Sequence, residues 1–372
     1  MRQEPLNTVT LMAGGDIGPV IKPVDQFAEL IAPVLQQADI RFGQCERTYS
    51  KRGWPPRYAT VSTGMNTRLD PEMASIFKAA RIDVVSLAGN HTMEWGPEAL
   101  EDTMEMFHSM GMQVVGAGKN EKEARSPVVI ERNGVRIAVL AYCSVLRDGH
   151  AAGPDKAGVA PMRAHTYYEP YDFQPGAPPK MITVPFEEDL AAMQEDIRQV
   201  KAQADVVILS LHWGVPYITK LIATYQPPVA HAAIDAGADL ILGHNPHLLK
   251  GVEVYKGKVC FYSIGNFLTT GSRGHRVPFE WNLYWYEMEE DSLYRFPVEC
   301  KKAMIAKAVM SKHGIERVSF LPVLINKQAQ PEALKRGDKR FQEVLEYAEW
   351  VSDQFPHTFV VEGDEIVVQS SS

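Results

Sequence analysis

Several short apolar runs in this chain are followed by a side chain that can bind a metal ion. These side chains carry carboxylate, amide or imidazole groups and belong to Asp16, Glu46, Asn90, His91, His212, His244 and His247. Such oxygen and imidazole donors suit borderline divalent ions such as manganese, iron, cobalt and zinc. The set contains no cysteine, which argues against a structural zinc site. Its composition therefore predicts a metal centre with a chemical role.

The run over residues 82–88 shows how a fold would position these groups. Its continuous apolar character is typical of a buried strand, and Gly89, Asn90 and His91 follow at the carboxyl end. Pro97 then opens a helix at a first-turn position, where proline is favoured. In open α/β sheets, ligands bind beyond the carboxyl ends of the strands. Because the other candidates also follow strand-like runs, we expect them to meet in one site.

The spacing of these residues is compatible with hydrolytic chemistry. Two imidazoles can converge from His244 and His247, and the Glu46 carboxylate could bridge two ions. Ions about 3.5–4 Å apart form the two-metal arrangement that hydrolyses phosphoesters and peptides. The nucleophile would be a metal-activated water, and His91 would protonate the leaving group.

Each residue taken alone has an ordinary explanation. A histidine after a strand is usually a surface or core residue, Asp16 after two glycines is typical of a turn, and Asn90-His91 before a helix is typical of a cap. The joint pattern over five strands favours a site. Trp213 and Tyr217 follow His212 closely and are therefore candidates for substrate contact, although such aromatics more often pack in a core.

Composition excludes several classes of protein. The 372 residues are 45% hydrophobic and 23% charged, which is ordinary for a globular protein, and the net charge of −8 comes without a basic stripe. We therefore expect no nucleic-acid partner. There is no apolar run of about 18 residues, which predicts no membrane span, and no signal-like region precedes the first strand, so we expect a cytoplasmic protein. The four cysteines lack C-x-x-C spacing and are expected to be buried thiols.

Periodicity predicts a mixed fold in which parallel units come first and hairpins later. Helices are expected over residues 24–37, 71–80, 97–110, 186–203, 227–236 and 338–354. Strands are expected over 9–13, 39–42, 82–88, 113–115, 205–211, 239–242, 281–287, 303–310, 314–321 and once within 359–369. Two hairpins are expected, over residues 128–142 and 252–263. We expect one domain over residues 1–372, with an irregular, substrate-covering insertion over about 147–185.

The ordered motifs resemble the PGA_cap (CapA) family of poly-γ-glutamate capsule-synthesis proteins, within the calcineurin-like metallophosphoesterase superfamily. The matching segments are Gly15-Asp16, Glu46-Arg47, Gly89-Asn90-His91 through Gly96, His212-Trp213-Gly214, Gly243-His244-Asn245-Pro246-His247 and Tyr262-Ser263-Ile264-Gly265-Asn266-Phe267. The resemblance implies a four-layer α/β/β/α sandwich of two mixed sheets. It also implies one metal held by Asp16, Glu46 and His247, a second held by Glu46, Asn90, His212 and His244, and His91 as the acid.

The chain departs from the superfamily at one expected metal ligand. The superfamily has Asp-x-His where this chain has Asp16-Ile17-Gly18, so one ligand of the first metal is missing. We therefore expect one or two divalent ions, which would be manganese, iron or zinc. The chain also lacks the N-terminal hydrophobic segment of membrane-anchored capsule members. Capsule assembly at a membrane is therefore not the natural inference.

The first functional hypothesis is a soluble metal-dependent hydrolase of a small anionic phosphoester, ester or amide. Arg47, Arg57 and Arg273 are candidates for binding its anionic group, because a guanidinium binds carboxylate or phosphate through two hydrogen bonds. Asn266, in the last motif, is a further candidate for substrate contact.

Two alternatives remain open. The chain could be an accessory protein that binds polyglutamate or another anionic envelope polymer, as the missing ligand hints. It could also be a metal-dependent lyase or ring-cleaving enzyme, as the aromatic-rich loop over residues 50–67 hints. The sequence does not predict the oligomeric state.

Overall fold

The computed structural model describes residues 7–54, 68–271 and 287–371. The larger sheet has nine strands, whose order is β20 (Thr358–Glu362), β21 (Glu365–Gln369), β18 (Gly314–Ile325), β17 (Lys302–Ser311), β1 (Val9–Ile17), β2 (Ile40–Cys45), β5 (Val84–Ser86) and β6 (Gln113–Val115), with β19 (Pro331–Ala333) beside β18. The half from β1 to β6 is parallel, and the half from β1 to β20 is antiparallel. This sheet is therefore mixed, as the sequence predicts.

The second sheet has six strands and is also mixed. Its order is β15 (Val252–Tyr255), β16 (Lys258–Phe261), β14 (Leu240–His244), β13 (Val206–His212), β9 (Val135–Cys143) and β8 (Val128–Arg132). The four central strands run parallel, while β8 and β15 close antiparallel hairpins at the two edges. Both hairpins lie where the sequence predicts them.

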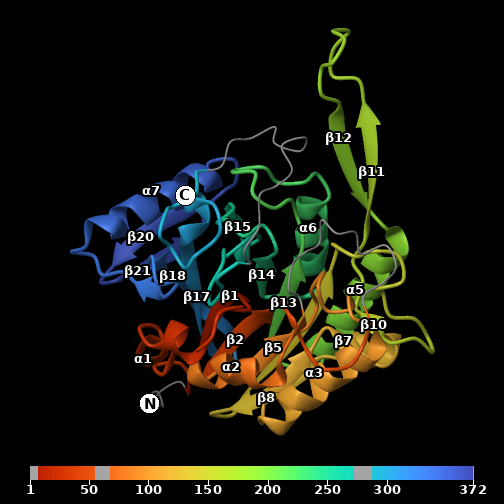
Figure 1. Ribbon diagram of the computed structural model, residues 1–372. Helices are drawn as coiled ribbons and strands as arrows, with labels where there is room; N and C mark the ends of the chain where they lie inside the picture. Colours follow the sequence, from red (N-terminus) through yellow and green to blue (C-terminus); the bar gives the residue numbers. More distant parts are fainter. Residues whose placement is uncertain (1–6, 55–67, 272–286, 372) are drawn as a thin grey trace, which may run out of the picture.

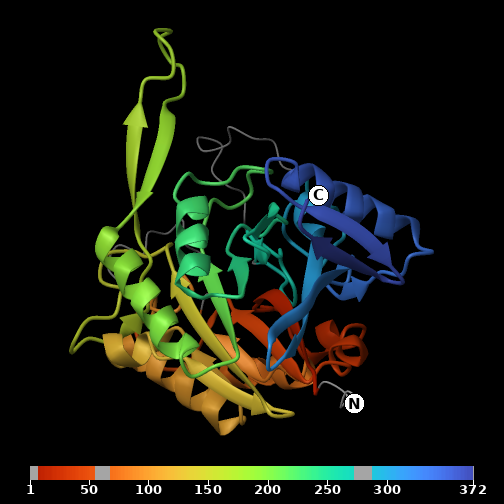
Figure 2. The same cartoon turned by 180° about the vertical axis from the view of Figure 1, so that it is seen from behind.

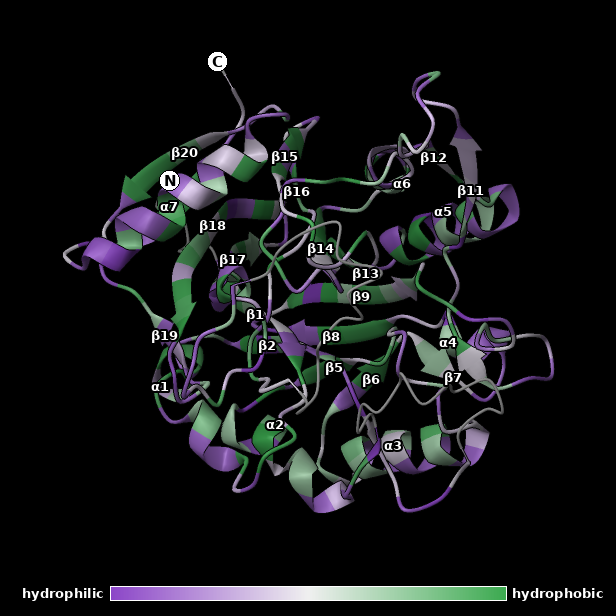
Figure 3. Ribbon diagram, turned by 45° about the horizontal axis from the view of Figure 1, so that its top comes forward, coloured by the Kyte–Doolittle hydropathy of each residue, from purple (hydrophilic) through white to green (hydrophobic). Residues whose placement is uncertain are grey.

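The two sheets and their helices form four layers. Alternate residues of the six-stranded sheet face opposite sides: Leu140 and Leu209 pack with Ile197 of α5 (Glu187–Lys201), whereas Val139 and Ile208 belong to the core shared with the larger sheet. α6 (Gln226–Ala236) lies beside α5. On the far side, α2 (Ser75–Ala79) and α3 (Pro97–Ser109) cover the larger sheet (Figures 1 and 3). The predicted four-layer α/β/β/α sandwich is confirmed.

The C-terminal part adds a helix and two strands. α7 (Lys339–Ser352) covers most of the segment over which a helix is expected, and it packs on β18 and β15 (Figure 1). The tail forms the hairpin of β20 and β21, so the expectation of a single strand is wrong. The turn at Gly363, with a φ of +62°, reverses the chain between the two strands. Among the described residues, no helix combines the length and apolarity needed to span a membrane.

The helix expected over residues 24–37 is broken. A 3-10 turn, η1 (Asp25–Ala28), and a four-residue helix, α1 (Ala32–Leu35), stand in its place. Pro33 explains the break, because its ring would clash with the carbonyl of the preceding turn of a continuous helix. Phe27, Ile31 and Leu35 are buried, whereas Leu30 is 45% exposed, so the periodicity found most of the buried face but not the break.

The segment over residues 147–185 contains strands rather than only irregular structure. β10 (Gly158–Val159) pairs with β7 (Ala117–Gly118), and β11 (Ala164–Glu169) pairs with β12 (Lys180–Pro185). The β11–β12 hairpin, here called the arm, stands out from the body of the molecule (Figures 1 and 2).

The remaining short elements complete the part of the chain that the structure describes. They are β3 (Thr48–Tyr49), β4 (Arg68–Leu69), η3 (Pro71–Ala74), α4 (Glu121–Ala124) and η5 (Val298–Lys301). All four cysteines are buried free thiols, as expected. Most of the strand expected over residues 281–287 lies outside the described residues.

The first strand is longer than the sequence predicts. The expectation of a turn at Gly14-Gly15-Asp16 is wrong, because β1 continues to Ile17. The two glycines instead allow close packing: a Cβ on Gly15 would lie 1.8 Å from the carbonyl oxygen of Gly265, and one on Gly14 would lie 2.5 Å from the Phe267 ring. The strand therefore delivers Asp16 within the sheet rather than on a loop.

We predict that Gly15→Ala lowers the free energy of unfolding by about 2 kcal/mol or more, because the added methyl group meets backbone that cannot move aside. Urea denaturation of the metal-free protein measures the change. Gly337→Ala is the control, since its Cβ meets no atom within 4 Å, and it should shift stability by less than about 0.5 kcal/mol. Equal stability of the two variants would contradict the close packing of β1.

Candidate metal centre

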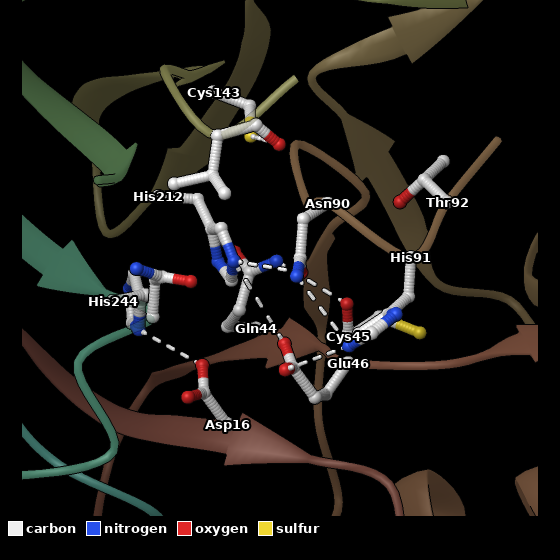
Figure 4. Close-up of polar contacts among 12 residues, drawn as sticks. Asp16, Gln44, Cys45, Glu46, Asn90, His91, Thr92, Cys143, His212 and His244 are labelled. Atoms are coloured by element: carbon white, nitrogen blue, oxygen red, sulfur yellow. Dashed lines mark hydrogen bonds and ion pairs between the residues drawn. The ribbon is translucent and has the colours of Figure 1, made fainter. Parts of the chain in front are cut away.

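The candidate ligands come from the carboxyl ends of parallel strands in both sheets. Asp16 lies near the end of β1, and Glu46 directly follows β2. His212 and His244 are the last residues of β13 and β14 and lie opposite each other in the ladder. Asn90 lies in the turn after β5. The predicted convergence of strand ends is therefore seen, with the two sheets facing each other across the site (Figure 4).

Glu46 lies at the centre of these side chains. Its Oε2 atom is 4.0 Å from Nε2 of His212, and its Oε1 atom is 3.7 Å from Nε2 of both His247 and His91. The Asn90 Oδ1 atom lies 3.1 Å from His212 Nε2. Figure 4 shows Asn90, His91 and His212 around Glu46, with Asn90 and His212 on one side of it.

Asp16 gathers two further imidazoles. Its Oδ2 atom is 3.2 Å from Nδ1 of His247, and its Oδ1 atom is 4.0 Å from Nδ1 of His244. Ligand atoms of Asp16, Glu46 and His212 all lie within 4.8 Å of one another. Metal–ligand bonds of about 2.0–2.2 Å place tetrahedral ligands about 3.3 Å apart, so the spacings need only small adjustments to enclose an ion.

The donors are buried and lack other partners. Asp16, His212 and His244 are fully buried, and Glu46 is 2% exposed. Within the described parts of the chain, Asp16 Oδ1, Glu46 Oε2 and both ring nitrogens of His244 have no hydrogen-bond partner. Burying polar groups without partners is costly, and native structures seldom do so without a bound ion or water. The residues present therefore fit a divalent cation.

Burial also sets the protonation of the site. It lowers the pKa of His212 to about 3 and that of His244 to about 4. Both rings are thus neutral at physiological pH, which is the form that binds metals. Burial together with the charge of Asp16 raises the pKa of Glu46, and the nearby His91, His247 and Arg47 offset this only in part.

His247 is oriented by a chain of hydrogen bonds. Its Nδ1 atom lies 2.8 Å from Oδ1 of Asn266, whose Nδ2 donates to the hydroxyl of Tyr294 at 2.7 Å. Donation from Nδ1 leaves the Nε2 lone pair directed toward Glu46. Asn266 is fully buried and engaged at both ends, so it positions His247, and its expected contact with substrate stays a prediction. Burial opposes a cation on His247, but the contact with Asp16 and the charge of Glu46 raise its pKa.

His91 has a partner that the sequence-based reasoning missed. Its Nδ1 atom lies 2.9 Å from Oε2 of Glu94, three residues further on, and Glu94 is also paired with Arg147 at 3.6 Å. Glu94 is only 8% exposed. Glu94 lies within the motif from Asn90 to Gly96, and this position was the one signal from which the sequence could have identified it. The pairing directs the Nε2 atom of His91 toward Glu46 and the ligand cluster.

The structure places the two aromatic candidates differently. Trp213 is fully buried under α6, where its indole stacks on Tyr262 at 5.5 Å and donates to the Tyr262 carbonyl, so its expected substrate contact is wrong. The strand alternation that points His212 into the site turns the next side chain away. Tyr217 lies beside the site, with its ring stacked on His247 at 5.2 Å.

Arg47 is held close to the cluster. It is 4% exposed, and its Nε atom has no hydrogen-bond partner within the described residues. A Cβ on Gly18 would lie 2.5 Å from Cγ of Arg47, so the Arg47 stem occupies the space that a ligand side chain at position 18 would need. Its charge favours the ionised form of Glu46. The other two candidate arginines, Arg57 and Arg273, lie outside the described residues.

Comparison with known proteins gives one family. The model of the family described as bacterial capsule synthesis protein PGA_cap matches residues 10–270. The PGA biosynthesis protein CapA of Bacillus subtilis is 30% identical over 280 residues, which cover 74% of this chain and 65% of that protein. A probable polyglutamine synthesis accessory protein of Mycobacterium tuberculosis is 30% identical over 216 residues, covering 56% of this chain and 51% of that protein.

Among solved structures, the calcineurin-like phosphoesterase YfkN from Bacillus subtilis aligns with a TM-score of 0.38 at 14% identity. The alignment covers 88% of this chain and 89% of that one. The chain spans about half to two thirds of the length of the curated relatives it matches.

We predict that the purified protein, reconstituted with manganese, iron or zinc and desalted, retains at least one equivalent of metal. The double variant His212→Ala/His244→Ala should lose it, because two neutral imidazole ligands are removed. Elemental mass spectrometry measures the ratio of metal to protein. The variant His108→Ala/His313→Ala removes two exposed histidines elsewhere and should retain the metal. Equal metal content in both double variants would place the ion outside this cluster.

Proposed function

The chain belongs to the PGA_cap family of bacterial capsule synthesis proteins, and from that premise we propose that it is a metal-dependent hydrolase of an anionic phosphoester, ester or amide. The observation that carries the proposal is the buried set of unpartnered carboxylate and imidazole atoms around Asp16, Glu46 and His244. A purely structural cluster would pair these atoms with one another. A cluster that binds a cation leaves these atoms free to coordinate it.

The ligand set divides around Glu46. Asp16 and His247 lie on one side, and Asn90 and His212 lie on the other, with His244 next to Asp16. One or two ions of manganese, iron or zinc would be held there, and they would supply Lewis-acid activation of water at neutral pH. Because the Arg47 stem fills the space beside Gly18, the Asp16 side has no ligand from position 18. We infer that the Glu46–His212 side holds its ion more tightly.

His91 would serve as the general acid. The Glu94 carboxylate lies 2.9 Å from Nδ1 and orients the ring, so that Nε2 faces the reacting group as a proton donor. The Nε2 atom lies 3.7 Å from Glu46 Oε1, at the edge of the ligand cluster rather than inside it. A leaving group held next to the cluster is thus within reach of this proton. Glu94 acts through His91 and is a positioning residue.

Arg47 would bind the anionic group of the substrate. Its guanidinium is nearly buried, so a carboxylate or phosphate would meet it with little competition from water. Tyr217, stacked on His247, provides an apolar wall next to the same cluster.

A second candidate function is an accessory role in handling an anionic polymer. It is favoured by the names of the relatives, which refer to PGA biosynthesis and to a polyglutamine synthesis accessory protein. The two candidates differ in turnover: an accessory protein would bind poly-γ-glutamate without cleaving a bond, whereas the hydrolase consumes its substrate.

For the acid, we predict that His91→Ala lowers kcat by about 10²–10⁴-fold while metal content is unchanged, because general acid catalysis is lost but the ligands remain. Glu94→Gln should lower kcat less, since it weakens only the orientation of the ring. Turnover would be measured with the metal-loaded protein on aryl phosphomonoesters, phosphodiesters and γ-glutamyl peptides. Glu98→Gln, an exposed carboxylate of the same segment, is the control and should leave kcat unchanged. Full activity of His91→Ala would remove the assigned acid.

For the anion site, we predict that Arg47→Met raises KM by about 10–100-fold, because a charge-assisted hydrogen bond of about 1.5–3 kcal/mol is lost. Methionine keeps the apolar stem that packs over Gly18, so the fold is preserved. The kcat value should change less than KM. An unchanged KM would show that another group binds the anion.

A further inference from the structure

The arm is attached to the body only at its base. There the His165 ring stacks on Phe186 at 3.9 Å, and Thr183 is held by Thr224. Toward the tip, β11 pairs with β12 and with no other described strand. An isolated two-stranded hairpin is marginally stable in water. An arm of this kind gains stability from a further strand or a packing partner.

The arm concentrates exposed apolar surface. Of the eleven exposed large hydrophobic side chains among the described residues, six lie on it: Tyr167, Tyr168, Tyr171, Phe173, Met181 and Val184. The exposed fraction is 54% for Tyr167 and 68% for Tyr168, which are neighbours on β11 and therefore face opposite sides. Both faces of the arm are thus apolar, and such a patch marks an interaction surface.

The hydrogen-bond pattern shows which edge of the arm is open. The backbone N–H of Thr183 donates to Oγ1 of Thr224 at 2.6 Å, and that hydroxyl donates to the Thr183 carbonyl at 2.8 Å. The backbone of Thr183 therefore points away from its partner Thr166 in the ladder. By the alternation of antiparallel pairs, the backbone groups of Thr166 and Tyr168 also point outward, on the opposite edge. The β12 edge is capped at Thr183, and the β11 edge is open.

The open edge lacks the features that normally protect an edge strand. β11 contains no lysine, no proline and no bulge, and its one acidic residue, Glu169, stands at the end. Natural sheets use such features to prevent pairing with another strand. Their absence on β11, next to exposed tyrosines, is typical of a strand that pairs.

We propose that β11 pairs antiparallel with β11 of a second copy of this chain, around a two-fold axis at Tyr167. In this register Thr166 faces Tyr168 of the second copy, and each such pair exchanges both backbone hydrogen bonds. The Tyr167 rings of the two copies face each other, and His165 of one copy faces the Glu169 carboxylate of the other. Every residue pair across the two-fold axis is therefore compatible. The result is a four-stranded sheet with an isologous interface.

Charge argues against an anionic polymer as the occupant of this edge. Between residues 164 and 185 the charged side chains are Glu169, Asp172 and Lys180, so acids outnumber bases. Glu169 and Lys180 also face each other across the ladder, which leaves Asp172 without a compensating cation on the arm. A polyanion would be repelled, whereas the His165–Glu169 pairing is complementary between copies.

Sedimentation velocity over a concentration series tests the interface. The wild-type chain should form a dimer. Thr166→Pro should be monomeric, because it removes an outward N–H but no bond of the β11–β12 ladder. Tyr167→Lys should also be monomeric, because it places two like charges opposite each other. Tyr171→Ala, on the loop beyond the pairing segment, should dimerise like the wild type. A monomeric wild type, or a dimer that survives both substitutions, would overturn the proposal.

Disulfide trapping tests the register. Because the four native cysteines are buried, a cysteine on the arm is the reactive one. Tyr167→Cys should form an intermolecular disulfide under mild oxidation, since residues opposite each other at a non-hydrogen-bonded position have Cα atoms about 4.5 Å apart. Tyr168→Cys, which faces Thr166, should cross-link far less. Equal cross-linking of the two variants, or none in Tyr167→Cys, would contradict the two-fold pairing.

Discussion

The structure depends on the burial of two carboxylates, Asp16 and Glu46, next to each other at the junction of two sheets. Removing like charges from water costs several kcal/mol unless positive charge or hydrogen bonds compensate them. The surrounding imidazoles compensate only in part, because burial keeps His212 and His244 neutral. The arrangement is consistent with a site that is completed by a cation.

Much of the fold serves this junction. The parallel strands of both sheets end at the same place, so side chains at or just after the ends of five of them can meet. Gly15 allows β1 to approach Gly265, and the Asn266–Tyr294 bonds fix the ring of His247. Metal sites of this kind require such support, because ligand orientation controls both affinity and reactivity. Mutations outside the ligand set are therefore expected to alter metal binding.

The patterns of buried strands and their polar ends predicted a mixed α/β fold and the meeting of the candidate ligands, and the family resemblance implied the four layers. It could not predict local departures from those patterns. The break at Pro33 was not predicted, because the apolar spacing on its two sides is typical of one continuous helix. Trp213 was assigned to the site by proximity to His212, although strand alternation turns adjacent side chains to opposite faces. Glu94 was missed because its role depends on a turn geometry that places it against His91.

The most direct test of the account is an anomalous-scattering experiment on crystals of the metal-loaded protein, with data collected at the absorption edge of the bound ion. The account predicts a peak within about 2.0–2.4 Å of a Glu46 carboxylate oxygen, with His212 or His247 as a further ligand. A second peak on the Asp16 side would show that two ions bind despite Gly18. A fully loaded protein whose anomalous peaks all lie away from Glu46 would contradict the metal centre.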